Sequence, residues 1–159
     1  GDWDEDRIIP DIIKSIKNNK KLLIRKPYAT RPWQHVLDTV WAYMIISQEL
    51  FIKNSAAQDS WNIGPNNNKY IKVIDIVKIF QKNFKKLTFK IDKKFKYNES
   101  SDLKLNNLKM KKVFNWKPVL SEKENFKLTI DWYKEFLNKG DVKLITRRQV
   151  NYFFSKIIK

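Results

Sequence analysis

The sequence of 159 residues contains no cysteine, only three glycines and a single histidine. Without cysteine, the chain cannot form a disulfide, a thiolate nucleophile or a Cys-ligated zinc site. Gly1, Gly64 and Gly140 stand far apart, so neither a dinucleotide-binding fingerprint nor a P-loop can be built. The lone His35 has no evident serine partner for nucleophilic catalysis, and only carboxylates could join it around a metal. We therefore expect no catalytic residue and no metal ion in this chain.

Long apolar runs are also lacking. No stretch of about 18 apolar residues occurs, so the sequence predicts no membrane-spanning helix and no membrane partner. The chain starts with a polar, acidic segment, which is unlike a secretory signal, and we expect the protein to be cytoplasmic. Because the first residue is Gly1 rather than Met, we expect either an earlier cleavage or a piece of a longer polypeptide.

The chain carries a net charge of +16, which comes from 28 lysines and only 5 arginines. Clustered positive charge is typical of nucleic-acid-binding proteins. Here the lysines are spread along the chain, and Lys, Ile and Asn are in excess together. This joint excess indicates a compositional bias that fills solvated faces with Lys. We therefore expect a solvated basic surface and no nucleic-acid partner, and a basic nucleic-acid-binding module remains the alternative.

Apolar residues at helical spacing predict five or six helices. Ser121 with Glu124, and Thr146 with Gln149, have the spacing of capping boxes, which predicts a helix start at each. Asn115 before Pro118 and Gly140 mark helix ends. The predicted helices cover residues 8–17, 36–53, 70–84, a short segment up to 114, 121–139 and 146–158.

Short alternating or β-branched segments predict four or five brief strands, over residues 21–25, 60–63, 87–91 and 103–105. Helices mixed with short strands indicate the α/β class, in one lobe over residues 1–159 without an internal boundary. So few strands would leave much apolar helix surface uncovered. We infer that a partner domain is missing.

Arginines are informative where Lys is the default cation, because their planar fork suits phosphate. Arg31 lies at a loop-to-helix junction, where backbone donors also favour anions; the alternative is a structural pair with Asp38 or a backbone carbonyl. We favour phosphate binding for Arg31, whereas for Arg7 the acidic run at residues 4–6 makes salt bridging equally plausible. Arg25 is expected to be structural or solvated.

Other candidates have ordinary explanations on sequence grounds. His35, at a helix start, is expected to be a hydrogen-bonded structural residue rather than a general base. Trp33 and Trp61 could stack on a base or sugar, although Trp is more often core. Glu99 lies in a polar loop and is expected to be solvated. Arg147 and Arg148 would lie in the first turn of the last helix, where their charge opposes the helix dipole.

The order of motifs resembles the C-terminal half of the extended short-chain dehydrogenase/reductase family, and within it the CDP-glucose 4,6-dehydratase branch. The similarity extends over nearly the whole chain. It is carried by Gly1-Asp2-Trp3, Arg7-Ile8-Ile9-Pro10-Asp11, Arg31-Pro32-Trp33-Gln34-His35-Val36, Trp61-Asn62-Ile63-Gly64-Pro65, Trp116-Lys117-Pro118 and Asp131-Trp132-Tyr133.

The resemblance implies a substrate-binding lobe whose N-terminal Rossmann half is missing. In the family, that half binds NAD and carries the acid/base Tyr-x-x-x-Lys pair, both of which we expect to be absent here. Members oxidise C4 of the hexose, eliminate water across C5–C6 and return the hydride to C6. The implied class is a lyase of deoxysugar and O-antigen biosynthesis that converts CDP-glucose to CDP-4-keto-6-deoxyglucose.

Carried over by position, the resemblance assigns substrate-binding roles to six residues, and Trp33, which could stack on a base or sugar, completes the predicted set of seven. Arg31 matches the phosphate-binding arginine, Asn62 lines the nucleotide site, and Glu99 falls in the loop that closes over the base. The sequence departs from the family at Asn115, where Gly is usual, and at Tyr97, where His is expected. The complete set is Arg7, Ile8, Ile9, Arg31, Trp33, Asn62 and Glu99.

We therefore expect the substrate-binding portion of an NAD-dependent sugar-nucleotide 4,6-dehydratase, inactive alone. Its expected partners are the sugar nucleotide and a Rossmann half, fused or separate; the sequence leaves a homodimer open. Another epimerase or dehydratase of the superfamily, or a degenerate fragment without function, are the alternatives.

Overall fold

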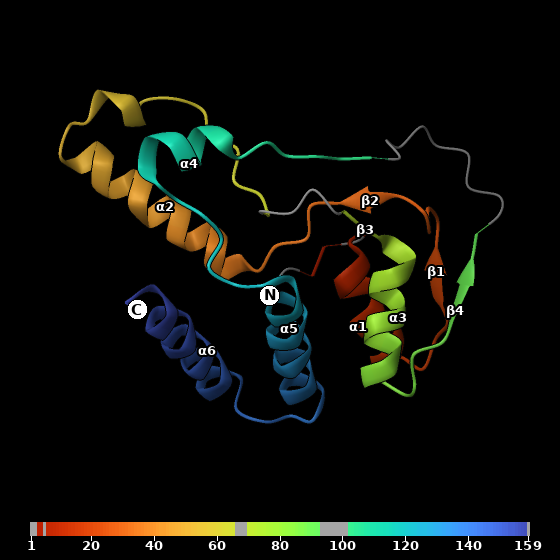
Figure 1. Ribbon diagram of the computed structural model, residues 1–159. Helices are drawn as coiled ribbons and strands as arrows, with labels where there is room; N and C mark the ends of the chain where they lie inside the picture. The colour runs from red at the N-terminus through yellow and green to blue at the C-terminus, as the bar shows by residue number, and fades with distance from the viewer. Residues whose placement is uncertain (1–2, 5, 66–69, 93–101, 159) are drawn as a thin grey trace. The chain divides into compact units, whose positions relative to one another are not determined.

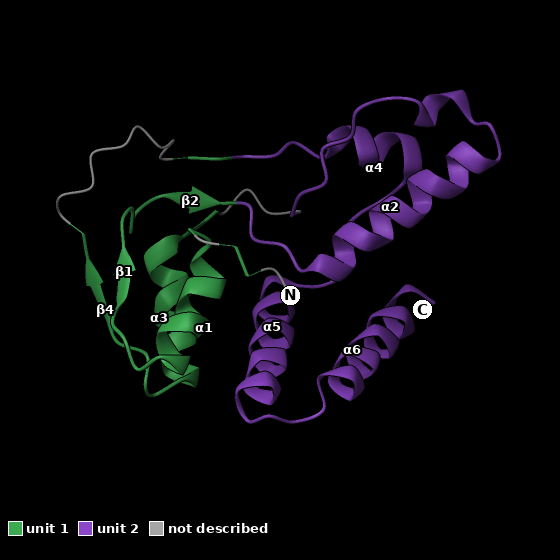
Figure 2. Ribbon diagram, turned by 180° about the vertical axis from the view of Figure 1, so that it is seen from behind, with its two compact units in different colours: residues 1–31, 70–103 green, residues 32–69, 104–159 purple. Residues whose placement is uncertain are grey.

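The computed structural model describes residues 3–4, 6–65, 70–92 and 102–158. Within them the chain forms six α-helices, four short strands and the 3-10 helix η1 (Ser55–Ala57), which confirms the expected α/β class (Figure 1). The chain divides into two compact units, residues 1–31 with 70–103 and residues 32–69 with 104–159 (Figure 2). The expectation of one lobe without an internal boundary stays a prediction.

Two short strand pairs lie in the first unit. β1 (Leu22–Ile24) pairs in parallel with β4 (Phe89–Ile91). β2 (Thr30–Arg31) pairs antiparallel with β3 (Ile71–Lys72), and this pairing fixes the backbone of Arg31.

Two helices complete the core of the first unit. Helix α1 (Ile8–Lys17) contacts both α3 (Val73–Asn83) and β1, as Figure 1 shows. Their inward side chains recur every three or four positions, which is the spacing of a buried helix face. The buried apolar core consists of Ile12, Ile13, Leu22, Ile24, Ile76, Val77, Phe80, Phe84 and Leu87.

Helix α3 begins at Val73, three residues later than predicted, because Ile71 and Lys72 belong to β3. Lys72 at its N-cap makes no side-chain cap bond. Instead, loop carbonyls accept the first amides: Val73 donates to Ala29 O at 2.9 Å and Ile74 donates to Pro27 O at 2.8 Å. These backbone bonds satisfy donors that a helix start otherwise leaves open.

The second unit is helical in its described part. It contains α2 (Val36–Phe51), α4 (Leu108–Phe114), α5 (Glu122–Leu137) and α6 (Val142–Ile157). α2 and α4 share one core cluster, and α5 packs on α6. The cluster consists of buried Ala42, Met110 and Trp116, with Trp41, Ile45, Ile46, Trp61, Ile63 and Phe114 packed against it.

The two predicted strands at residues 60–63 and 103–105 are wrong. Trp61 instead turns its side chain into the α2–α4 cluster, where its Nε1 donates to Ala57 O at 3.1 Å and its ring meets Phe114 at 4.6 Å. A strand also needs a partner for its ladder, and among the described residues none pairs with 60–63. Near the second segment, only Asp102 forms an isolated bridge, with Thr30.

Helix caps explain the remaining differences. The Ser121–Glu124 capping box is confirmed, and so is the left-handed stop at Asn115, where φ is 49°. The box predicted at Thr146 is wrong, because α6 starts at Val142 and is capped by the Asp141 carboxylate. Helix α5 ends at Leu137, and Lys139, not Gly140, has the positive φ, at 56°.

Nowhere in the described ranges is a helix both long and apolar enough to cross a membrane.

Candidate functional site

The start of helix α1 carries three of the seven predicted substrate-binding residues, Arg7, Ile8 and Ile9. Arg7 is the N-cap, is exposed and provides no side-chain cap bond. Among the described residues, the N–H groups of Ile8 and Ile9 have no hydrogen-bond acceptor. Pro10 follows and has no N–H to satisfy. Within the described part of the chain, this helix start therefore presents two backbone donors without an acceptor, beside an exposed guanidinium.

Asp6, in the acidic run before α1, does not pair with Arg7. It pairs instead with Arg25, with 2.7 Å between Oδ1 and Nη2, and it adopts a positive φ of 64°. The structural role expected for Arg25 is thereby confirmed. For Arg7, one of the salt-bridge partners that the sequence offered is taken.

Arg31 lies at the end of β2 and is half-buried. Its Nη1 donates to the carbonyl of Thr30 at 2.8 Å, so the backbone-carbonyl alternative is realised at one nitrogen of the fork. Thr30 is itself held by Asp102, whose Oδ1 accepts from Thr30 Oγ1 at 2.6 Å. The phosphate-binding role of Arg31 stays a prediction.

The helix end expected to assist Arg31 is closed by His35. Its Nδ1 accepts from the Leu37 amide at 3.3 Å, which makes His35 the N-cap of α2. Burial lowers the pKa of the imidazole to about 4. His35 is therefore neutral at pH 7 with one ring nitrogen engaged, which confirms the structural role predicted for it.

The remaining predicted site residues are Trp33, Asn62 and Glu99. Trp33 is half-buried and Asn62 is exposed, both in the second unit, whereas Arg7 and Arg31 belong to the first. Glu99, together with Tyr97, lies outside the described residues. The roles of Trp33, Asn62 and Glu99 stay predictions.

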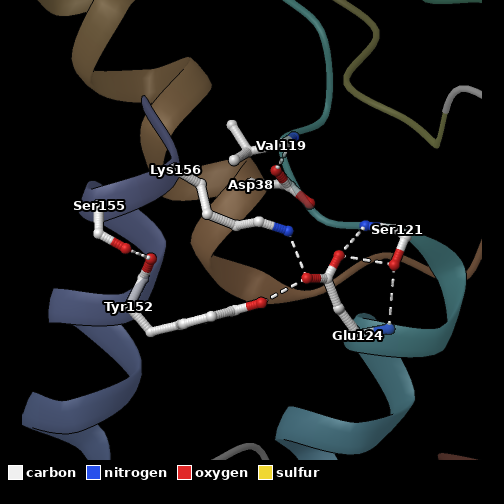
Figure 3. Close-up of polar contacts among 7 residues, drawn as sticks. All are labelled: Asp38, Val119, Ser121, Glu124, Tyr152, Ser155 and Lys156. Atoms are coloured by element: carbon white, nitrogen blue, oxygen red, sulfur yellow. Dashed lines mark hydrogen bonds and ion pairs between the residues drawn. The ribbon is translucent and has the colours of Figure 1, made fainter. Parts of the chain in front are cut away.

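A polar network that the sequence analysis missed joins α5 to α6 around Glu124 (Figure 3). Glu124 accepts from the Ser121 amide at 2.8 Å and from Ser121 Oγ at 2.6 Å, completing the capping box. Tyr152 and Lys156, one turn apart on α6, both donate to Glu124 Oε1. These donors, with Lys156 contributing most, hold the pKa of Glu124 well below its usual range, and Glu124 raises the pKa of Lys156.

Tyr152 and Lys156 also stand at the Tyr-x-x-x-Lys spacing. The expectation that the acid/base pair of the family is absent from this chain stays a prediction. Neither side chain of the Tyr152 and Lys156 pair is available for acid/base chemistry. The phenol and the ammonium both bind the Glu124 carboxylate, and the ion pair keeps Lys156 charged. A general base must be able to release and take up a proton. We therefore interpret this pair as a structural link between two helices.

Asp38 is fully buried in the first turn of α2. Its Oδ1 accepts from the Val119 amide at 2.6 Å (Figure 3), whereas no described residue donates a hydrogen bond to its Oδ2. Burial raises the pKa of this carboxyl, and the Val119 N–H acts against that rise. Asp38 thus ties α2 to the segment before α5.

Comparisons with known proteins agree with the motifs. No protein-family model matches the chain. The chain is 31% identical over 156 residues to CDP-glucose 4,6-dehydratase of Salmonella typhimurium, covering 98% of this chain but 44% of that protein. The crystal structure of UDP-glucuronic acid 4-epimerase from Bacillus cereus, in complex with UDP-glucuronic acid and NAD, matches with a TM-score of 0.61 and 18% identity.

The structural match covers 82% of this chain and 40% of the epimerase chain, and at this identity it shows the fold alone. The chain thus spans less than half of the length of each of these two proteins. The resemblance carried by the motifs is confirmed: this chain is similar to the C-terminal part of an extended short-chain dehydrogenase/reductase, that of CDP-glucose 4,6-dehydratase.

Proposed function

We propose that this chain is the substrate-binding portion of an NAD-dependent sugar-nucleotide 4,6-dehydratase that converts CDP-glucose to CDP-4-keto-6-deoxyglucose. The observation that carries the proposal is the 31% identity to CDP-glucose 4,6-dehydratase over 98% of the chain. The reaction class is a lyase of deoxysugar biosynthesis. The chain binds and orients the substrate, and it has no turnover by itself.

The diphosphate of the substrate lies at the start of α1 in this proposal. Three features of this helix start suit an anion. The described residues offer no acceptor for the N–H groups of Ile8 and Ile9, the helix dipole is positive at this end, and the Arg7 guanidinium is exposed. No carboxylate among the described residues forms an ion pair with Arg7 that would compete with the substrate.

Arg31 provides a second phosphate contact. Its backbone is fixed by the β2–β3 pairing, and its bond to the Thr30 carbonyl orients the guanidinium. A guanidinium held in this way loses less rotamer freedom when it binds a phosphate oxygen. Trp33, Asn62 and Glu99 complete the proposed set, as walls of the nucleotide and sugar site.

The residues of this chain do not fit NAD. The only parallel strand pair in the described part, β1–β4, is followed by no Gly-rich turn, since the chain has three isolated glycines. The first amides of α3 donate to Ala29 O and Pro27 O, so they are not open to a pyrophosphate. NAD, which supplies hydride transfer, is therefore assigned to a Rossmann half outside this chain, fused or separate.

Turnover tests the proposal. The purified 159-residue chain, mixed with CDP-glucose and NAD, is expected to form no 4-keto-6-deoxy product. The same chain, fused to the part of the Salmonella typhimurium dehydratase that lies outside the match, is expected to form it. Product from the isolated chain would overturn the claim of inactivity. A folded fusion that turns over UDP-glucose but not CDP-glucose would instead favour another member of the superfamily.

A further inference from the structure

Helix α2 differs in composition from every other helix of the described chain. Its 16 residues include no lysine, although the chain has 28. Its only charged residues are Asp38, which is fully buried, and Glu49, which is half-buried and accepts from Asn54 Nδ2 at 2.6 Å. The other five α-helices each carry two or more lysines. Where lysine fills solvated faces by default, its absence indicates a face that is not solvated in the working protein.

One face of α2 is already covered within the second unit. Ala42 is fully buried against Met110 and Trp116, and Trp41, Ile45 and Ile46 pack against the same cluster. Trp41 also meets the ring of Phe154 on α6, with 6.3 Å between centroids. The hydrophobic core of the unit thus accounts for this face.

The opposite face of α2 is equally apolar but exposed. Val36, Val40, Tyr43 and Phe51 recur at intervals of three, four and eight residues, so they lie on one side of the helix. We call this set, with Met44 and Leu50, the outer face of α2. The exposed fractions are 64% for Val36, 43% for Val40, 57% for Tyr43, 48% for Met44, 44% for Leu50 and 88% for Phe51.

A helix that is apolar all round is typical of a central layer, with neighbours on both sides. The outer face runs over about four turns, roughly 24 Å. Its large apolar side chains form one continuous stripe, whereas the apolar residues of an ordinary protein surface are scattered singly. The structure therefore points to a docking surface.

Charge argues against a second copy of this chain as the occupant. Two copies would bring together chains that each carry a net charge of +16. No acidic side chain projects from α2 to compensate, because Asp38 is buried and Glu49 is bonded to Asn54. Like charges at this density oppose association.

The matched proteins offer a better occupant. More than half of each lies outside the match, within the same polypeptide as the part that this chain resembles. That remainder must contact the matched part through some surface. The outer face of α2 carries six exposed large apolar side chains on a single helix, which makes it a suitable contact surface.

We propose that the outer face of α2 is the docking surface for the cofactor-binding half. This inference rests on the proposed function, since it takes its occupant from there.

Cysteine labelling tests the docking surface directly, because the natural chain has no cysteine. Single substitutions Val40→Cys and Met44→Cys report on the outer face. Leu144→Cys on α6 and Val113→Cys on α4 are matched controls, since their native side chains are 43% and 44% exposed, against 43% and 48% at the test positions. Each variant is made in the isolated chain and in the fusion to the unmatched part of the Salmonella typhimurium dehydratase.

In the fusion, thiol labelling at positions 40 and 44, followed by peptide mass spectrometry, is expected to slow by at least about tenfold, which corresponds to a mostly docked state. Labelling at positions 113 and 144 is expected to stay within about twofold. Equal labelling at all four positions, or slow labelling at 40 and 44 already in the isolated chain, would overturn the docking surface. The readout needs no substrate, so a fusion that protects α2 but ignores CDP-glucose would refute the proposed function alone.

Discussion

Burial of the His35 imidazole makes the stability of this chain depend on pH. The pKa is about 4 in the folded chain and 6.5 when the residue is solvated. Above pH 6.5 both states are neutral, but between 6.5 and 4 only the unfolded chain takes up the proton. The free energy of unfolding therefore falls as the pH is lowered through this window.

We expect the wild-type chain to lose about 2 kcal/mol between about pH 7.5 and pH 5, at 1.36 kcal/mol per unit of pKa. His35→Asn keeps a cap acceptor for the Leu37 amide and removes the titration, so its urea unfolding should vary little over that range. The chain has no second histidine to confuse the comparison. An unchanged slope in the variant would refute this account of His35.

Glu124 makes the stability of the chain depend on pH in both the acidic and the alkaline range. Because its pKa is lowered, its contribution to folding stability is present above the usual pKa of 4.5 and is lost as the pH falls below it. The raised pKa of Lys156 means that the contribution of the ion pair is present below 10.5 and is lost at higher pH. Between these limits the pair links α5 to α6.

Glu124→Gln keeps a capping-box side chain but removes the charge that Lys156 and Tyr152 bind. We expect a loss of about 1 kcal/mol at neutral pH, because the carboxylate is partly exposed and its ion pair is screened. Glu122→Gln, in the same helical turn, controls for the loss of a negative charge near the helix start. Thermal unfolding of both variants tests this prediction. Equal melting temperatures for Glu124→Gln and Glu122→Gln would show that the network around Glu124 contributes nothing to stability.

At the scale of elements, Asp38 holds α2 to the segment that enters α5. Asp38→Ala leaves the Val119 amide without its acceptor in a buried place, and we expect a loss of about 2 kcal/mol. Asp38→Asn keeps an acceptor and should cost less. Asp75, at the same position of α3 but exposed, is the matched control, and Asp75→Ala should cost at most about 1 kcal/mol through the helix dipole. Chemical denaturation gives all three values, and equal losses for Asp38→Ala and Asp75→Ala would contradict the role of the buried carboxylate.

Helices could be predicted from the sequence because their signals are local. The apolar spacing and the Ser121–Glu124 box lie within a few residues of the structure that they specify. Local signals also led to a wrong prediction. Thr146 and Gln149 have the spacing of a capping box, yet Asp141 caps α6 five residues earlier. Asp141 directly follows Gly140 and is itself a preferred N-cap residue, so this signal was present in the sequence.

Strands and the site depended on distant partners. Whether residues 60–63 form a strand depends on a neighbouring strand, and the described chain offers none. The Glu124 network joins residues 28 and 32 positions apart, and only the packing of α5 on α6 brings them together. The i, i+4 spacing of Tyr152 and Lys156 was visible, but their shared carboxylate was not.

At the scale of the whole molecule, our proposal assigns substrate binding to this chain and the chemistry of the reaction to a part outside it. The chain lacks a Gly-rich turn, its only histidine caps a helix, and its Tyr-x-x-x-Lys spacing is bound to Glu124. Open backbone donors at α1 and the fixed guanidinium of Arg31 are the groups suited to a nucleoside diphosphate. The central claim is therefore that this chain binds a sugar nucleotide through these groups.

Calorimetric titration of CDP-glucose into the full 159-residue chain tests that claim most directly. We predict binding by the wild-type chain and a dissociation constant at least about tenfold higher for Arg31→Gln, because a charge-assisted phosphate contact is lost. Arg148→Gln removes the same charge from an exposed position of the second unit and should change the constant less than about twofold. Equal constants for wild type and Arg31→Gln, or no binding by the folded wild-type chain, would contradict the account.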